Sequence, residues 1–366
     1  MNKKKNLLIC GNPNPVSRIM IENLMDTHNI FFIAYSKKSQ FLKIKDLLRD
    51  HVFVNKRSYI HNIMLWIFIC LIICKKQKID TFIAYTDNPI PNGLCILLLK
   101  WFFPQINRVF FPYDIISYAV PKEFKYQHKN KIFYFFDRIC YEHADKIITK
   151  GSDNELKYLE GIYHVYNKPH FPFNFLIEKK HSISKKNVKL DMNNINIVFV
   201  GGITKKDDSL AAFNNILKNK NITLHIYSHS LEEIKTNIQS YENLVFHSYV
   251  SDHKKFIKEI STYDFGLSYS YSFKEEFLQS KMASGVRIYD YLSAGLPIII
   301  DDKHELMANI IKENNFGIII PIRDEEHIFS YIKKHDYRKL ISSVEKNRKK
   351  FFVESNINKL VKFLDQ

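Results

Sequence analysis

Glycine is scarce in this chain: only 10 of its 366 residues are glycine. No G-x-G-x-x-G or G-x-x-x-x-G-K-[ST] segment occurs, which argues against nicotinamide-dependent enzymes and P-loop ATPases. A G-x-S-x-G elbow is also absent, which argues against an α/β-hydrolase. The few glycines that directly follow a predicted strand are therefore more informative than usual, because glycine tolerates close backbone approach and positive φ.

Cysteine and metal-type histidine patterns are also sparse. The five cysteines are an odd number without a C-x-x-C pair, so we expect reduced core residues and a cytoplasmic protein. Fifteen histidines are spread over the chain. His225 and His229 straddle a strand end, and His247 and His253 lie too far apart for a simple pair, so neither a metal site nor a cofactor is expected. The cysteines are Cys10, Cys70, Cys74, Cys95 and Cys140.

Acidic residues are fewer than basic ones, and the formal net charge is +16. This favours an anionic partner such as nucleic acid, an acidic membrane leaflet or a phosphorylated substrate. The basic residues are dispersed, and no RNA-recognition, zinc-finger or helix-turn-helix signature is visible. A nucleic-acid-binding protein is thus a remote alternative, and no nucleic-acid partner is expected.

Long hydrophobic runs are nearly absent. The chain opens with lysines and only a short apolar run before Gly11, so no signal peptide is expected. Residues 63–74 (IMLWIFICLIIC) are followed by Lys75 and Lys76. A membrane-spanning helix needs about 20 apolar residues, and this run is shorter. It predicts either a buried helix against a sheet or an interfacial helix with its lysines on lipid headgroups.

Short apolar runs alternate with longer amphipathic stretches, which is typical of βαβ units and a parallel sheet. The length suits two domains of about 180 residues each. We predict an N-terminal Rossmann-like domain over residues 1–175, a lysine-rich linker over 176–194 and a C-terminal Rossmann-like domain over 195–350. A helix within residues 351–366 is expected to pack back on the first domain. Ligands of such sheets bind beyond the carboxyl ends of the strands.

The individual elements follow from the same alternation. The predicted strands are residues 7–10, 30–35, 81–85, 108–111, 146–149 and 163–166 in the first half, and 195–200, 223–227, 244–247, 264–269, 297–300 and 317–321 in the second. The clearest predicted helices are residues 17–27, 59–74, 93–103, 131–143, 286–293, 304–313 and 354–366.

The most specific segment is residues 287–300, RIYDYLSAGLPIII. It resembles the donor-site motif of GT-B glycosyltransferases, K-x-x-E-Y-L-A-A-G-x-P-V-I, in which a helix ends at glycine and proline opens the next strand. Residues 197–202, 225–228, 243–247 and 263–268 also fit this family, and 142–149 fit its first domain. The resemblance implies a family 4-like, nucleotide-sugar-dependent transferase with two Rossmann-like parallel-sheet domains facing each other across a cleft. It implies that the domain over 1–175 binds the acceptor and the domain over 195–350 binds the nucleotide-sugar.

The resemblance also implies a donor site. Arg287 stands at the family's basic position and would stabilise the charge that develops on the departing nucleotide diphosphate. Asp290 would accept hydrogen bonds from ribose hydroxyls; the alternative is a solvated carboxylate paired with Arg287 at i, i+3. Backbone amides beside glycines can meet phosphate. The remaining candidate donor-binding residues are Gly201, Gly202, Lys205, Lys206, Tyr249 and Gly295.

Two departures from the retaining branch of the family bear on the reaction. That branch carries arginine in a G-R-L-x-x-x-K-G stretch, where this chain has Gly202, and the first acid of its E-x(7)-E pair is missing before Asp290. An inverting β-glucuronosyltransferase of xanthan-type assembly is a closer likeness, with a catalytic aspartate at the end of a first-domain strand. Asp114 is the corresponding candidate base and Asp87 the second candidate. Alternatively, Asp114 caps a turn.

Together these features predict an enzyme that moves a sugar from a UDP-sugar to a lipid-linked or surface-polysaccharide acceptor. We expect it on the inner face of a bacterial plasma membrane, because the first half is basic and rich in aromatic residues. A retaining transferase and a nucleotide-sugar epimerase of the same fold remain alternatives.

Overall fold

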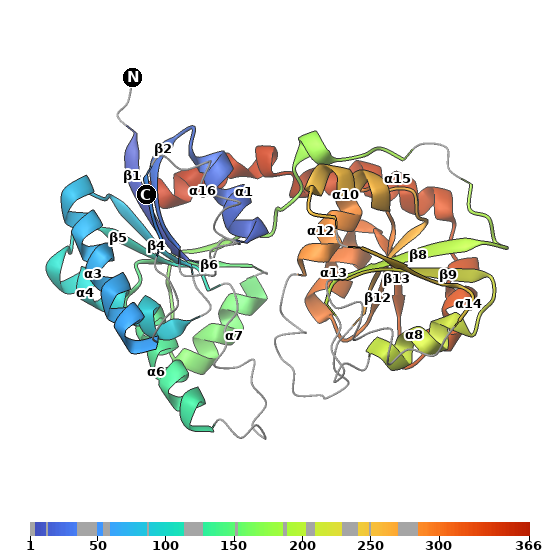
Figure 1. Ribbon diagram of the computed structural model, residues 1–366, viewed down its shortest axis with the longest axis horizontal. Helices are drawn as coiled ribbons and strands as arrows, with labels where there is room; N and C mark the ends of the chain where they lie inside the picture. Colours follow the sequence, from blue (N-terminus) through green and yellow to red (C-terminus); the bar gives the residue numbers. More distant parts are fainter. Residues whose placement is uncertain are drawn as a thin grey trace. The chain divides into compact units, whose positions relative to one another are not determined.

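The computed structural model describes residues 4–11, 14–34, 50–53, 59–85, 88–112, 127–150, 153–185, 189–202, 209–228, 241–248, 250–269 and 285–366 (Figure 1). The chain divides into two compact units. The first consists of residues 1–174 and 356–366, and the second of residues 175–355. Each unit is built on its own parallel sheet covered by helices.

The first unit contains a seven-stranded sheet in the order β3-β2-β1-β4-β5-β6-β7. All of the paired strands are parallel. The order reverses between β1 and β4, as in doubly wound folds. The strands are β1 (Lys5–Gly11), β2 (His28–Ala34), β3 (Asp50–Phe53), β4 (Thr81–Tyr85), β5 (Asn107–Phe110), β6 (Lys146–Thr149) and β7 (His170–Pro172).

Three helices, α3 (Tyr59–Gln77), α4 (Pro89–Phe102) and α6 (Gln127–His143), form one layer of the first unit, with α4 between the other two. Together with α7 (Asp153–Tyr163) they share one hydrophobic core with the sheet. Helix α1 (Pro15–Leu24) is the remaining helix of the first half that the structure describes. Its sequence fixes its start, because the Asn14 side chain accepts from the Ser17 backbone in a capping box.

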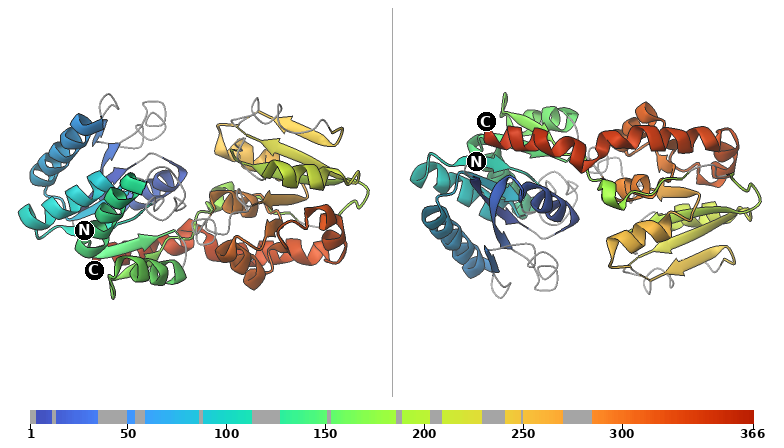
Figure 2. Two further views of the ribbon diagram at one scale, coloured as in Figure 1. Left: turned by 90° about the horizontal axis from the view of Figure 1, so that it is seen from below. Right: turned by 90° about the horizontal axis from the view of Figure 1, so that it is seen from above.

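The C-terminal helix α16 (Val353–Asp365) returns to the first unit, and Figure 2 shows it in red beside the elements of that unit. The Lys146 ammonium donates to the carbonyl of Phe363 at 2.8 Å and to that of Leu364 at 3.2 Å. Lys5 pairs with Asp365 at 3.2 Å. Burial lowers the pKa of Lys146 from its ordinary value, and its two carbonyl acceptors favour the charged form.

The second unit contains a six-stranded parallel sheet in the order β10-β9-β8-β11-β12-β13. Its strands are β8 (Ile195–Val200), β9 (Ile222–Tyr227), β10 (Leu244–His247), β11 (Phe265–Ser268), β12 (Ile298–Asp301) and β13 (Gly317–Ile320). Its helices are α8 (Ser209–Leu217), α10 (His253–Ile260), α12 (Val286–Ser293), α13 (Glu305–Asn314), α14 (Ile328–Lys333) and α15 (Tyr337–Asn347), with single turns η1 (Lys179–His181), η2 (Glu325–His327) and η3 (Arg348–Phe351).

The segment ahead of β8 is held by the second unit. Ile177 is buried and forms an isolated parallel bridge with Phe352. The Ile183 amide donates to the Ser293 carbonyl at 2.7 Å, and the Lys185 ammonium donates to the Tyr263 carbonyl. Residues 176–194 are polar in composition, yet their first half is fixed by backbone hydrogen bonds and a few buried side chains.

Two details of the predicted strands are wrong. Residues 163–166 do not form a strand, because α7 continues to Tyr163, whose ring stacks on Tyr141 in the core. His164 and Asn167 then have positive φ values of 55° and 61°, which interrupt an extended chain, and the strand follows as β7. The strand β3 was not predicted. The helix over 286–293 is found with the predicted bounds.

The five cysteines are all free and buried, as predicted. Trp66 is also buried in the core, although α3 exposes Met64, Leu65 and Phe68. In the parts of the chain that the structure describes, none of the helices combines the length and the apolar character that crossing a bilayer requires.

Candidate functional site

The strand order of the second sheet reverses between β8 and β11, the place where doubly wound sheets bind their ligands. Gly201 and Gly202 directly follow β8, and α12 is the described helix that follows β11. Gly201 has a φ of 143°, a conformation that residues with a side chain rarely adopt, and its amide donates to the Tyr227 carbonyl at 3.0 Å.

Tyr291 of α12 connects these two strands. Its hydroxyl donates to the Leu267 carbonyl in β11 at 2.9 Å and accepts from the Val200 amide at the end of β8 at 3.0 Å. Burial raises the pKa of the Tyr291 phenol above its ordinary value, so the phenol remains neutral and can donate. Gly266 makes room for the ring, since an added Cβ would lie 2.2 Å from it.

Arg287 is the second residue of α12, after the N-cap Gly285. Its guanidinium carbon lies 4.7 Å from the centre of the Phe199 ring, so the charge is held over the side chain of a β8 residue. Burial lowers the pKa of Arg287 from its ordinary value, but an arginine stays protonated at neutral pH. The first turn of a helix also offers backbone amides and a partial positive charge. This end of α12 is therefore suited to an anionic group.

Asp290 lies one turn further along α12 and accepts a hydrogen bond from His253 Nε2 at 2.9 Å. His253 is the first residue of α10, whose N-cap Asp252 accepts from the Lys255 amide at 2.8 Å. From the sequence, His253 was named only in the metal pair with His247 that its spacing disfavours. The N-cap aspartate is the local signal that puts His253 in the first turn of a helix.

Gly295 lies just beyond the opposite end of α12 from Arg287. At 1.5 Å per residue the two are about 12 Å apart along the helix axis. The Gly295 φ is +73°, and an added Cβ would lie 2.8 Å from the Ile183 carbonyl. Arg348 secures the same end by donating to the Leu292 carbonyl at 2.7 Å. A glycine at position 295 is thus explained by the way in which α12 ends, and this end of the helix is distant from Arg287.

Five of the predicted site residues lie outside the residues that the structure describes: Asp87, Asp114, Lys205, Lys206 and Tyr249. The strands that precede Asp87, Asp114, Lys205 and Lys206 in the chain are described. Asp87 follows β4 and Asp114 follows β5, and these strands are adjacent and parallel, with Ala84 opposite Phe110. Lys205 and Lys206 follow Gly202.

Residues 197–360, most of the second unit, match the family model described as the glucosyltransferase 3-like C-terminal domain. No curated protein matches the chain.

Among solved structures, the chain is similar to the HepE protein of Anabaena in complex with UDP, with a TM-score of 0.73, 10% identity and 99% of each chain covered. It is also similar to sucrose-phosphate synthase from Thermosynechococcus elongatus, with a TM-score of 0.73, 13% identity and 98% of each chain covered. A glycosyltransferase from Rickettsia africae gives a TM-score of 0.71, 13% identity and 99% coverage of each chain.

These likenesses confirm the predicted GT-B fold, with its two Rossmann-like domains. The match of residues 197–360 to a glucosyltransferase domain shows that the second unit contains a glycosyltransferase domain.

Replacing Tyr291 by phenylalanine tests the connection between β8 and β11. We expect Tyr291→Phe to reduce the free energy of unfolding by about 1–3 kcal/mol, because the Val200 amide and the Leu267 carbonyl lose a buried partner. Thermal and urea unfolding measure the change. Tyr166→Phe, at an exposed tyrosine, is the matched control and is expected to be neutral. Equal stability of the two variants would refute the role given to the Tyr291 hydroxyl.

Proposed function

We propose that this glycosyltransferase moves a sugar from a UDP-sugar to a lipid-linked or surface-polysaccharide acceptor. The observation that carries the proposal is the Arg287 guanidinium, held over Phe199 in the first turn of α12, near the end of β8 where Gly201 and Gly202 follow. The comparisons support the donor, because HepE structures contain UDP and UDP-glucose. The matched domain family is named for glucosyltransferase 3.

In this proposal the donor diphosphate binds between the backbone after β8 and the N-terminus of α12. Negative charge grows on the diphosphate as the bond to the sugar breaks. Arg287 offers paired N–H donors to it, and Gly201 and Gly202 allow the backbone to approach closely. Lys205, Lys206 and Tyr249 are proposed as further donor contacts. Asp290 accepts from the ribose hydroxyls.

The transfer is proposed to invert the anomeric centre, with Asp114 as the base that removes the proton from the acceptor hydroxyl during its attack. Asp114 follows β5 in the sequence, and β5 pairs with β4. This order supports the role, because the carboxyl ends of parallel strands gather functional residues. Asp87, after β4, is the second candidate. We propose that no metal ion takes part in the transfer step, since Arg287 and backbone amides can neutralise the diphosphate.

The protein is proposed to bind the inner face of a bacterial plasma membrane through α3, α4 and α6. Seven large apolar side chains on these helices are 49–65% exposed. The exposed lysines Lys75, Lys76, Lys100 and Lys131 occur on the same helices, and α3 and α4 carry no acidic residue. Lysines attract an acidic leaflet while apolar side chains enter its surface. The apolar residues are Met64, Leu65, Phe68, Trp101, Phe102, Ile132 and Phe135.

The Arg287→Ala variant tests the donor site. We expect kcat/KM for the UDP-sugar to fall by about 100-fold or more, because a charge-stabilising donor is removed. The rise in melting temperature that UDP gives to the native protein should also shrink. Arg338→Ala, at an exposed arginine of the same unit, is the matched control. If Arg287→Ala binds UDP and turns over like the control, the donor site is elsewhere. Because no metal ion is proposed to take part in the transfer step, activity should persist in EDTA.

The Asp114→Asn variant tests the catalytic base. We expect transfer to fall by about 100-fold or more while UDP still raises the melting temperature, because the amide cannot accept the hydroxyl proton. Asp87→Asn is measured beside it. A wild-type rate in Asp114→Asn with loss in Asp87→Asn would assign the base to Asp87. Nuclear magnetic resonance of the product gives the anomer, and a retained configuration would contradict inversion.

Membrane binding is tested by co-sedimentation with vesicles. We expect more protein to bind vesicles with anionic lipid than purely zwitterionic vesicles, and less to bind in high salt. Trp101→Ser combined with Phe102→Ser should weaken binding by about tenfold or more, since each ring contributes about 1.5–3 kcal/mol on burial. Tyr166→Ser, at an exposed aromatic residue outside these helices, should have no effect. Binding that ignores lipid charge, salt and the double change would contradict the membrane role.

A further inference from the structure

Three metal-ligand side chains converge in the second unit. Glu178, His181 and His253 each offer one ligand atom, and these atoms lie within 4.8 Å of one another. Glu178 directly precedes η1, His181 is the last residue of η1, and His253 begins α10. No metal site was expected from the sequence, because the histidines are spread over the chain and His253 was compared only with His247. Glu178 and His181 occur in the segment that was predicted as a linker.

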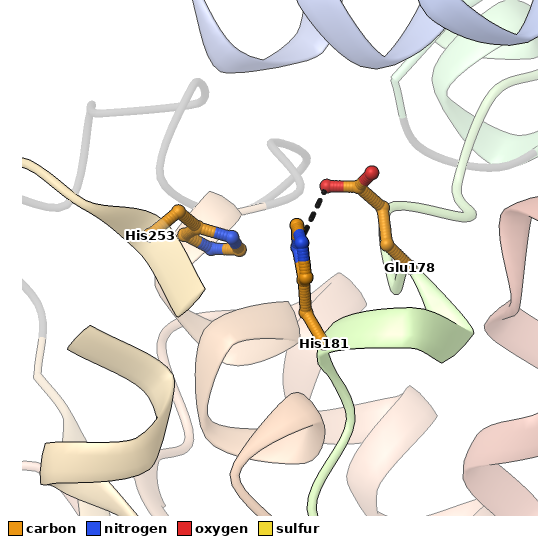
Figure 3. Close-up of side chains that lie close together, drawn as sticks. All are labelled: Glu178, His181 and His253. Atoms are coloured by element: carbon orange, nitrogen blue, oxygen red, sulfur yellow. Dashed lines mark ion pairs between the residues drawn. The ribbon is translucent and has the colours of Figure 1, made fainter. Parts of the chain in front are cut away.

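Figure 3 shows the imidazole of His181 between the other two side chains. His181 Nδ1 is 3.3 Å from Glu178 Oε2, and the rings of His181 and His253 are 5.6 Å apart at an angle of 66°. The Glu178 side chain is only 3% exposed, and Lys180 lies 3.0 Å from its other oxygen. A buried carboxylate and two imidazoles thus come together at one place.

The hydrogen bond from His253 to Asp290 defines which nitrogen could bind a metal. Asp290 accepts from Nε2, so a neutral His253 carries its proton on Nε2 and keeps a lone pair on Nδ1. Within the described part of the chain, Nδ1 is buried and has no hydrogen-bond partner. In zinc sites, a ligating histidine usually donates its other ring N–H to a carboxylate, which fixes the orientation of the ring and raises its basicity.

We infer that Glu178, His181 and His253 bind one Zn²⁺ ion. Two imidazoles and one carboxylate suit zinc, which takes four tetrahedral ligands and can complete the set with water. Mg²⁺ and Ca²⁺ prefer oxygen ligands and fit this set poorly. Ligand atoms about 2.0–2.2 Å from one zinc ion lie about 3.4 Å apart, so side-chain shifts of about 1 Å would close the cluster.

Zinc at this site would have a structural role. It would connect the segment before β8 to the start of α10, and it would hold His253 in the orientation that bonds to Asp290 of α12. The ion takes no part in the proposed transfer step. The inference therefore goes beyond the proposed function and does not depend on it.

The test uses the full-length, tag-free protein after treatment with a chelator. Titration with zinc chloride against a zinc-binding dye is expected to show one saturable site per chain, and zinc should raise the melting temperature. His181→Gln and His253→Gln should each weaken zinc affinity by about 100-fold or more. His335→Gln, at an exposed histidine of the same unit, should bind like the unchanged protein. Magnesium chloride should not compete.

Folding of each variant is checked by circular dichroism without zinc. Asp290→Asn provides an independent arm, because loss of a carboxylate behind a ligand is expected to weaken binding by about 10–100-fold without removing a ligand. No saturable site in the chelator-treated protein, or equal zinc affinity in His181→Gln, His253→Gln and His335→Gln, would overturn the inference. UDP binding is measured separately, so failure here leaves the donor site unaffected.

Discussion

The hydroxyl of Tyr291 holds together the part of the second unit on which the proposed donor site depends. Parallel sheets leave a gap where their strand order reverses, and here the phenol bonds to the backbone of both strands beside that gap. The hydroxyl accepts from the Val200 amide and donates to the Leu267 carbonyl, and these two bonds fix the position and the tilt of the ring. Gly266 allows the ring to lie against β11. The start of α12, with Arg287, is placed by this contact, and its end is placed by Gly295 and Arg348.

The positive charge of Arg287 in the second unit is stabilised by a specific partner, the ring of Phe199. The Arg287 guanidinium has been taken partly out of water, which costs free energy, and the face of Phe199 offsets some of that cost. A cation that is held in advance needs little reorganisation when a diphosphate arrives, and this is the main advantage of a preorganised site. The net charge of +16 does not produce such a site by itself. The net charge favours encounter with anionic partners in general, whereas the position of Arg287 would favour the diphosphate of the proposed donor.

Much of the fold could be predicted from short-range pattern. The helix over 286–293 was predicted with its observed bounds, because Gly295 and Pro297 mark its end. Tyr163 was assigned to a strand because it stands in a short, largely apolar run, but its ring packs in the core from the end of α7. The cluster at Glu178 could not be predicted, because His253 comes from a distant part of the chain and nothing in a lysine-rich segment indicates a buried carboxylate. The bond between His253 and Asp290 was missed for the same reason.

The Asp290 carboxylate can bond to His253 and to a ribose hydroxyl of the proposed donor at the same time. It has two oxygens with about four acceptor positions, and His253 uses one of them on Oδ1. The side chain is 18% exposed, so part of it still faces solvent. A ribose hydroxyl could therefore bond to Oδ2 while the imidazole holds Oδ1. The family motif has glutamate here, with one more rotatable bond. The shorter aspartate has fewer conformations to lose, and a histidine that fixes its direction reduces that loss further.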